Sequence, residues 1–478
     1  MSPLLFVLAM EYLSRLLRKV GKLRQFRVHS RCKRIGQNHL IFADDLMLFC
    51  YGDSQSISLI HRALKTFGNC SGLQANKAKT AIYFGNTSIS FREQTLRHTG
   101  FSEGSFPFRY LGIPLNAKYL RFADYDGLVD KMLSRITCWA SRNLSYAARV
   151  VLIKSVLMSL HVYWAQCLLL PASVLDRITQ ICRAFLWDGS ANLSRSPPIS
   201  WDWVCKPKAT GGLGIRNCKL WNKAALGKYV WKIVNKEDSL WVRWVHSIYL
   251  KDQEWWDYKP KSSAGWEWKK LCKVKDDLHS GFLEKAWAQH KYKISEVYDW
   301  LQGNNLRVVW HTWIWNNFNS PKHAFISWLA MHNRLKTRDR LERFDFCEDS
   351  NCLLCGNATE TRSHLFFECP YSRRSIDMIA VWLGIKNSCY NIDVAWLHWR
   401  KQFKDPICRK VGTAGLASVI YHLWFARNHA YWFKAVIHPR ILCRGICIET
   451  VDRSRQLITG SWTRKQCKWL YSLKGCIL

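Results

Sequence analysis

Acidic residues are scarce in this chain of 478 residues, which has 35 Asp and Glu against 71 Lys and Arg. The resulting formal charge of +36 repels itself unless a polyanion shares the surface, and nucleic acid is the commonest such partner. Apolar residues are not scarce. They make up 48% of the chain, which excludes a mainly disordered protein.

The sequence also lacks a secretion signal and an uninterrupted apolar span. Its first ten residues are apolar but contain no basic residue, and Glu11 follows at once, which is unlike a signal peptide. The longest apolar stretch, 150–170, is broken by Lys154, His161 and Gln166 and therefore predicts a buried helix rather than a bilayer span. We expect no membrane anchor and an intracellular, nuclear location.

In such a compartment the 19 cysteines are expected to be reduced thiols or metal ligands rather than disulfides. One group has the spacing of a metal site: a C-x-x-C pair at Cys352 and Cys355, followed by His364 and Cys369. Three thiolates and an imidazole close a tetrahedral Zn²⁺ site. Chance scatter in a cysteine-rich chain is the alternative, and Cys347 is a spare thiol, but the C-x-x-C pair is the better chelator.

Two adjacent carboxylates, Asp44 and Asp45, separate the apolar runs 39–43 and 46–51. This pattern predicts a strand, an acidic turn and a second strand. Like charges this close are relieved by a bound divalent cation, and polymerases hold two metals ~3.5–4 Å apart between carboxylates. Aspartate is also a common turn residue, so the pair alone is weak evidence for a Mg²⁺ site.

The residues after this pair extend the pattern to an α+β fold. Asp53 or Ser54 is expected to cap a helix whose apolar residues step by three and four, and Gly68 and Gly72 to end it. A short strand is predicted at 81–84. The order strand, turn, strand, helix, strand is that of the later half of a palm-like sheet.

Basic and aromatic residues are concentrated in three further segments. Residues 12–43 contain nine Lys or Arg and no acid, and from Lys401 onward 14 basic residues face three acids. Fourteen of the 26 tryptophans lie between 221 and 328. Solvated charge and a helical core are the ordinary explanations, and phosphate contacts and base stacking are the alternatives. We interpret the tail as helical, basic and in contact with nucleic acid, with too few acids for a ribonuclease H site.

Several motifs, in order, resemble the reverse transcriptases of plant LINE-type (non-LTR) retrotransposons. Residues 42–45 (FADD) resemble the family's [FY]-A-D-D box, and residues 2–6 (SPLLF) resemble the end of its Q-G-D-P-L-S-P-L-L-F segment. The further similarities are an S-G-L-x-x-N-x-x-K stretch, a primer-grip strand, a thumb signature, a downstream glycine-containing block and the cysteine and histidine motif, at 71–79, 108–115, 144–149, 201–214 and 352–370. The resemblance covers roughly residues 2–385.

The resemblance implies roles for particular residues. Asp44 and Asp45 would hold catalytic Mg²⁺, and Lys79 together with the primer-grip strand would position nucleotide and primer. The residues of that strand are Phe108, Arg109, Tyr110, Leu111 and Gly112. The implied α+β architecture comprises a partial palm, a helical thumb, a Trp-rich helical connector, a zinc-binding domain and a helical basic tail, at 1–115, 116–198, 199–304, 305–386 and 387–478.

The chain departs from the family at its start, which lies inside the Q-G-D-P segment. The first catalytic Asp, the fingers, the nucleotide-facing Gln and the family's endonuclease are therefore expected to be absent. Two of three carboxylates do not complete a two-metal site, so we expect a remnant that binds zinc and RNA, RNA–DNA hybrid or DNA without polymerising alone. The alternatives are a host-retained, non-catalytic nucleic-acid-binding zinc protein, and an active polymerase whose gene start was missed. The sequence does not set an oligomeric state.

Overall fold

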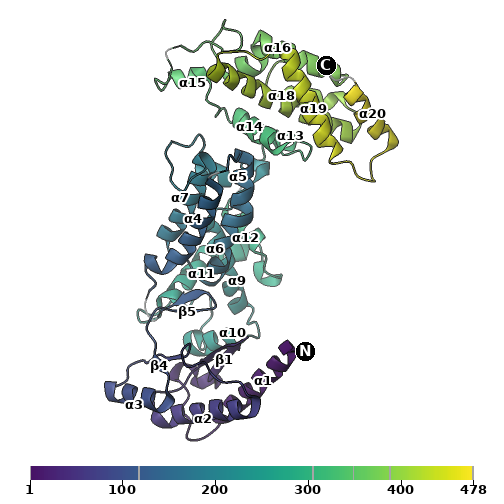
Figure 1. The fold of residues 1–478 in the computed structure, drawn as a ribbon. Coiled ribbons are helices and arrows are strands. Elements are labelled where there is room, and N and C mark those ends of the chain that lie inside the picture. Colours follow the sequence, from purple (N-terminus) through teal and green to yellow (C-terminus); the bar gives the residue numbers. More distant parts are fainter. Residues whose placement is uncertain are drawn as a thin grey trace. The chain divides into compact units, whose positions relative to one another are not determined.

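The structure is a computed structural model that describes residues 2–116, 119–140, 142–303, 306–347, 349–386 and 389–475. The described chain is mostly helical and contains three small two-stranded sheets, as expected for an α+β protein (Figure 1). Its internal contacts divide it into two compact units. Unit 1 is Met1–Asp126, Trp164–Pro171 and Asn222–Trp300, and unit 2 is Gly127–Tyr163, Ala172–Trp221 and Leu301–Leu478. The predicted domain boundaries at 305 and 387 fall outside the described residues.

The amino-terminal region of unit 1 is built on two packed helices. Helix α1 (Ser2–Gly21) and helix α2 (Ser54–Ser71) share an apolar core of Leu13, Leu17, Ala63 and Phe67. The Asp53 carboxylate caps the first turn of α2, and Gly72 ends the helix with φ 72°, both as expected. Gly68, also predicted to end it, lies inside the helix.

A hairpin of β1 (His39–Phe42) and β2 (Asp45–Leu48) packs on this core through one face, as the helices and strands in the lower part of Figure 1 show. Phe42 pairs with Asp45, so the two turn residues are Ala43 and Asp44. The predicted acidic turn is therefore shifted by one residue, and Asp45 begins the second strand. Ala43 has φ 51°, a positive value that two-residue hairpin turns require at their first position.

The remaining strands form two separate pairs instead of extending the hairpin. Strand β3 (Ala81–Ile82) pairs in parallel with β4 (Ser102–Glu103), and β5 (Phe108–Tyr110) pairs antiparallel with β6 (Ile113–Leu115). The predicted strand at 81–84 is thus present in shortened form. Within the described residues it does not join the hairpin in one continuous palm-like sheet.

The other helical segments of unit 1, or with most of their residues in it, frame these elements. They are η1 (Ser30–Ile35), α3 (Ile89–Thr99), η2 (Phe122–Tyr125), α9 (Cys218–Val234), α10 (Leu240–Val245), η5 (His246–Leu250), α11 (Trp266–Glu284), η6 (Trp287–Gln289) and α12 (Ile294–Leu301). The fourteen tryptophans between 221 and 328 are all buried or half-buried. Six of them are buried and fill the helical core, and the other eight are half-buried.

The apolar stretch after residue 145 forms α5 (Tyr146–Leu152), the π-helical η3 (Ile153–Leu157) and α6 (Met158–Cys167). Among the described residues it is the one helix long and apolar enough to cross a membrane, judged by length and composition alone. About a third of its most apolar window is buried, with Leu157 and Ala165 fully enclosed. Such a test is weak evidence for a membrane helix, since core helices of globular proteins pass it as well.

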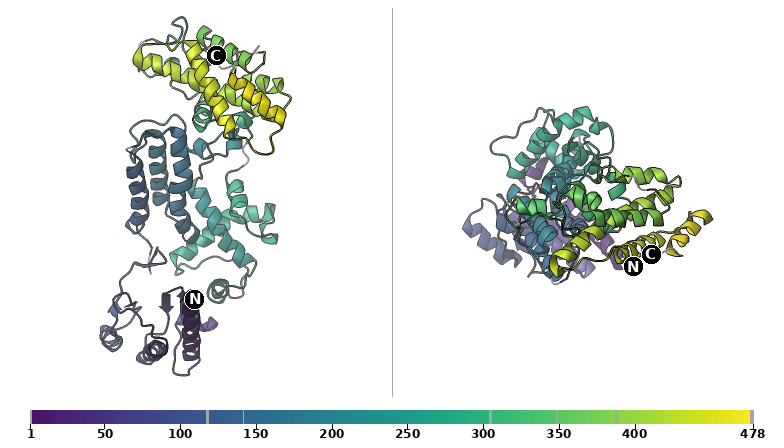
Figure 2. Two further views of the ribbon diagram at one scale, coloured as in Figure 1. Left: turned by 45° about the vertical axis from the view of Figure 1, so that its right-hand side comes forward. Right: turned by 90° about the horizontal axis from the view of Figure 1, so that it is seen from above.

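Unit 2 also contains a helical layer that spans the predicted zinc-binding domain and the tail. Within it α14 (Pro321–Met331) and α16 (Pro370–Trp382) pack against α18 (Pro406–Phe433) and α19 (Pro439–Arg455) (Figure 2). The Trp313 indole donates to the carbonyl of Thr413 at 3.0 Å. Residues of the two predicted segments therefore share one core, and the tail is helical as expected.

The other helical segments of unit 2, including one that crosses its boundary, complete the described chain. They are α4 (Asp126–Ala140), α7 (Ala172–Asp188), α8 (Trp201–Cys205), η4 (Lys208–Thr210), α13 (His311–Ile314), α15 (Arg338–Glu342), η7 (His364–Glu368), α17 (Ala395–Gln402) and α20 (Arg464–Gly475).

Candidate metal centre and acidic hairpin

The first two predicted zinc ligands lie on a tight turn. Asn351 and Thr359 form an antiparallel bridge, and the Cys352 amide donates to the carbonyl of Ala358 at 2.7 Å. Within the turn the Gly356 amide donates to the carbonyl of Cys352 at 2.7 Å, with Gly356 at φ 74°. This left-handed conformation suits glycine and folds the C-x-x-C pair back on itself.

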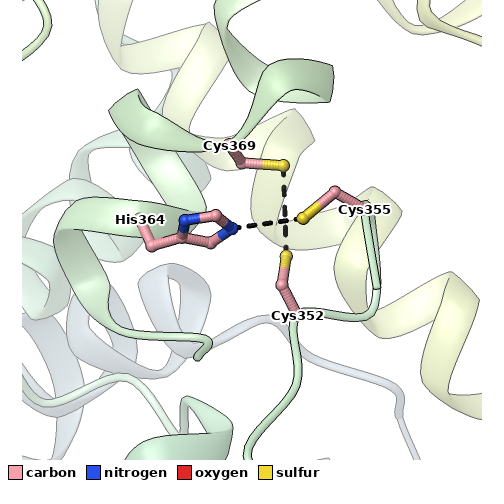
Figure 3. A group of neighbouring side chains, drawn as sticks. All are labelled: Cys352, Cys355, His364 and Cys369. Carbon is pink, nitrogen blue, oxygen red and sulfur yellow. Dashed lines mark hydrogen bonds between the residues drawn. The ribbon is translucent and has the colours of Figure 1, made fainter. Parts of the chain in front are cut away.

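The other two ligands come from the start of a helix. His364 is the first residue of η7, which is one turn of π-helix. Cys369 directly precedes Pro370, which occupies the first position of α16. Proline suits that position because no helical partner exists there for an amide. The chain therefore presents His364 and Cys369 from one side and the cysteine turn from the other (Figure 3).

The four side chains converge on one point (Figure 3). Their ligand atoms all lie within 4.8 Å of one another, with 4.0 Å between the sulfurs of Cys352 and Cys369 and 3.3 Å between the Cys355 sulfur and His364 Nε2. Ligands of a tetrahedral Zn²⁺ at normal bond lengths are roughly 3.5–3.8 Å apart. The residues therefore fit a zinc ion in number, chemistry and spacing. Cys347 lies outside the group, and its thiol faces the carbonyl of Arg338.

The thiols of this group are electrostatically uneven. The pKa of Cys369 is lowered, first because the Cys352 thiol donates to its sulfur and also because the amides of Ser372 and Tyr371 point to it. The pKa of Cys352 is raised because the same hydrogen bond stabilises its protonated form, and burial adds to the effect. A cation bound by both sulfurs would favour the thiolate form of each cysteine and so remove this difference in pKa.

A buried ion pair supports the cysteine turn from behind. Glu360 is fully buried, and one of its oxygens accepts hydrogen bonds from the Arg427 guanidinium at 2.8 Å and the Arg338 amide at 3.0 Å. Its other oxygen accepts the amide of Leu353, between the two cysteines, at 3.4 Å. Burial raises the pKa of Glu360, and the Arg427 charge opposes that rise. Arg427 lies on α18, so the tail contributes to the zinc group's scaffold.

This support was not foreseen from the sequence. Glu360 stands beside the ligand motif, but its partner is 67 residues away, on a helix that shows only apolar and basic periodicity. A buried glutamate needs a cationic partner, and that requirement is the one signal that could have prompted a search for Arg427.

The acidic hairpin is a more open arrangement. Asp44 and Asp45 are both exposed, and so is Phe42, at 60%. Tyr110 lies near enough that the Asp45 charge adds to the effect of burial in raising the pKa of the phenol. Within the described residues, no third acid, histidine or cysteine joins the two aspartates in a group with metal-binding geometry.

The residues predicted to position nucleotide and primer occupy separate elements. Lys79 is exposed, and its amide closes a turn onto the carbonyl of Asn76 at 3.1 Å. Phe108, Arg109 and Tyr110 form β5, and Leu111 and Gly112 are its hairpin turn, both with positive φ. The structure thus brings Tyr110 toward Asp45 but gives no contact between Lys79 and the aspartates.

Two segments of the chain match known protein families. Residues 1–115 match the family described as reverse transcriptase (RNA-dependent DNA polymerase), and residues 292–375 match the one described as zinc-binding in reverse transcriptase. The first match contains the acidic hairpin, and the second contains all four residues of the metal group. Both matches support a relationship of these two segments to the reverse transcriptases of plant non-LTR retrotransposons.

Two similar proteins occur in Arabidopsis thaliana. A protein named "Putative ribonuclease H protein" is 32% identical over 164 residues, which are 34% of this chain and 26% of that protein. One named "Uncharacterized mitochondrial protein" is 25% identical over 127 residues, 26% of this chain and 82% of its own length. The chain thus spans about a quarter of the first relative.

Proposed function

We propose that this reverse-transcriptase chain is a zinc-stabilised nucleic-acid-binding protein whose acidic hairpin does not catalyse polymerisation by itself. The observation that carries the proposal is the state of the nine basic side chains between residues 12 and 43. All nine are exposed, and among the described residues Arg15 alone forms an ion pair, with Glu11 at 3.0 Å. Eight cationic groups therefore face solvent without an acidic partner, which is the electrostatic footprint of a phosphate-binding surface.

The metal group has a structural role in this proposal. Cys352, Cys355, His364 and Cys369 would hold one Zn²⁺ with all four tetrahedral positions filled by protein, which leaves none open for water or substrate. A closed site stabilises a fold and does not activate a nucleophile. Zinc would therefore fix the turn and the start of α16 in place.

The proposed inactivity as a polymerase follows from the hairpin. In-line phosphoryl transfer needs two metals held at once, one at the attacking oxygen and one at the leaving oxygen. Asp44 and Asp45 provide carboxylates from a single exposed hairpin, and no third acidic group joins them in a metal-binding group among the described residues. In the palm assignment that the resemblance implies, these residues mark the position of the polymerase site without completing it. RNA and RNA–DNA hybrid are the ligands we propose.

Salt dependence of binding by the full chain tests the proposal. Each neutralised phosphate contributes about −0.7 to −0.9 to the slope of log affinity against log salt, so a steep negative slope is expected. Replacing Arg18, Lys22 and Arg24 with Gln should reduce that slope by about two units. The matched control replaces Lys259, Lys261 and Lys273, three exposed lysines elsewhere, with Gln.

Fluorescence anisotropy with labelled RNA and RNA–DNA hybrid gives both quantities. An affinity that hardly changes between low and physiological salt would contradict nucleic-acid binding through phosphate contacts. Equal losses in the two triple variants would instead assign the effect to net charge and remove the segment 12–43 from the proposed surface.

A further inference from the structure

The carboxyl-terminal half of α18 exposes a row of aromatic side chains. Phe425, His429 and Phe433 follow one another at helical spacing, with ring centroids 6.4 and 4.7 Å apart, and Trp432 lies beside them. Trp432 is 74% exposed, Phe433 71% and Phe425 49%. The opposite side of the same helix is buried through Leu423 and other apolar residues, so the exposed rings are not needed to hold α18 in the core. We call these four residues the aromatic row.

Helix α19 lies beside α18 and adds a basic rim to the row (Figures 1 and 2). Lys434 follows Phe433 directly, and Arg440 and Arg444 lie on the first turns of α19, all three exposed. Between Asp405 and Glu449 the sequence contains no acid at all. The row is therefore followed along the chain by exposed basic residues and by no acid before Glu449.

The one acid at the far end of this surface is already neutralised. Glu449 accepts hydrogen bonds from Lys322 and His323, both at 2.9 Å, and its pKa is lowered by them and by His422. Its negative charge therefore opposes a polyanion only weakly. A contiguous apolar surface that remains exposed on a folded unit marks an interaction site more often than it marks chance.

The chemistry of the row and rim favours one kind of ligand. Single-stranded nucleic acid binds where aromatic rings stack on unpaired bases and basic residues follow the backbone. A protein partner would have to supply an acidic complement, and a lipid surface, which also binds aromatic and basic side chains, is an alternative outcome of the test below. The geometry points to a platform for single-stranded RNA or DNA on α18 and α19, with bases on Trp432 and Phe433 and phosphates on Lys434, Arg440 and Arg444. This inference rests on the proposed nucleic-acid binding and adds the site and the strandedness.

The test compares single-stranded and duplex binding by the full chain at one salt concentration. Stacking contributes about 1–3 kcal/mol for each base, so Trp432→Ala with Phe433→Ala should weaken binding of a labelled single-stranded oligonucleotide tenfold or more. Duplex affinity and the salt slope should stay unchanged, because no basic residue is altered. Trp432→Tyr with Phe433→Tyr should restore single-strand binding, since the rings are kept.

The matched control is Phe344→Ala with Phe346→Ala, two exposed phenylalanines at 67% and 74% outside the row. A loss equal to that of the row variant would assign the effect to general apolar exposure and overturn the platform. Unchanged single-strand binding in the row variant would also overturn the platform. So would light scattering that shows a dimer for the wild type and a monomer for the row variant, because the row would then be a contact between copies. Binding of the wild type to phosphatidylserine vesicles that the row variant loses, with oligonucleotide binding unchanged, would assign the row to a lipid surface. If the wild-type chain binds no nucleic acid at all, the proposed function itself fails, and the row variant is not needed to show it.

Discussion

The metal group and the acidic hairpin were predicted from similar evidence, a short run of ligand-type residues, yet their surroundings differ. Around the zinc group, Cys352 and Cys369 are buried, and the turn is braced by the Glu360–Arg427 pair. Around the hairpin, Asp44 and Asp45 are exposed. Within the described residues, no third ligand joins them. Ligand-type residues make a metal site only when the fold brings enough of them to one point and excludes water from part of it.

The largest expected effect comes from the zinc ligands. His364→Ala or Cys369→Ala should abolish zinc binding and unfold the surrounding helices. Structural zinc contributes about 10–16 kcal/mol of apparent binding free energy, which is also folding free energy. Metal analysis of the purified chain should find one zinc in the wild type and none in the variants, and near-ultraviolet circular dichroism should report the lost packing. Chelator treatment of the wild type should have the same effect.

Cys347→Ala is the control for this prediction, because Cys347 is a nearby thiol outside the four-residue group. It should bind zinc and fold as the wild type does. Zinc retention in the His364 and Cys369 variants would contradict the assignment, and zinc loss in Cys347→Ala would mean that the ligand set is different.

A smaller but still large effect is expected from the ion pair that braces the turn. Arg427→Met leaves the buried Glu360 charge without its partner, which costs about 3–5 kcal/mol. Arg455→Met, which removes a pair with the exposed Asp452, should cost about 1 kcal/mol or less. Denaturant unfolding of the zinc-loaded chain measures both. Similar losses in the two variants would show that the Arg427 pair is not a buried support.

Lowering the pH should destabilise the protein through a buried ionisable group, His161, whose pKa is shifted by burial. Burial, and then the charge of Arg216, lower the pKa of His161 from its ordinary value of 6.5 to about 4. Between these two pH values His161 binds a proton in the unfolded chain and not in the folded chain. The free energy of unfolding therefore falls as the pH drops from about 6.5 to about 4. The loss is on the order of 3 kcal/mol.

His161→Leu should remove this part of the pH dependence, and the other titrating groups remain in both proteins. The difference between their unfolding free energies across the pH range is the measurement. Parallel pH profiles for the wild type and His161→Leu would contradict the buried, neutral histidine.

The smallest effect is expected at the hairpin itself. Asp44→Asn with Asp45→Asn changes only exposed side chains and should alter the free energy of unfolding by about 0.5 kcal/mol or less. Added Mg²⁺ should raise the melting temperature of the wild type no more than that of the double variant. A Mg²⁺-dependent stabilisation lost in the variant would show that the carboxylates hold a cation after all.

Local signals predicted the local features well. The cysteine spacing predicted a group that the fold does assemble, and the cap at Asp53 and the stop at Gly72 gave the ends of α2. The hairpin was predicted with an error of one residue, because sequence alone did not show that Ala43 would adopt the positive φ of the first turn position. Apolar runs locate the two strands of a hairpin but do not determine which residues form the turn between them.

Long-range pairings were beyond what these patterns contain. Nothing in the two-residue β3 indicates a parallel partner 21 residues later, and nothing near Glu360 identifies Arg427 as its counterion. The tryptophans show the same limit. Their number predicted either a core or a stacking surface, and only the structure shows which six are buried in the core. Packing between distant segments is settled by three-dimensional complementarity, which no single window of sequence records.

Primer extension by the full chain tests the central claim most directly, namely that the zinc-stabilised fold binds nucleic acid while its acidic hairpin does not polymerise. The assay uses a primed RNA template with Mg²⁺ or Mn²⁺ and compares the wild type with Asp44→Ala/Asp45→Ala. The account predicts binding of the template by the folded wild-type chain and no extended product from either protein. Extension by the wild type that disappears in the double variant would contradict it, and would require a carboxylate from another part of the chain or from a second chain.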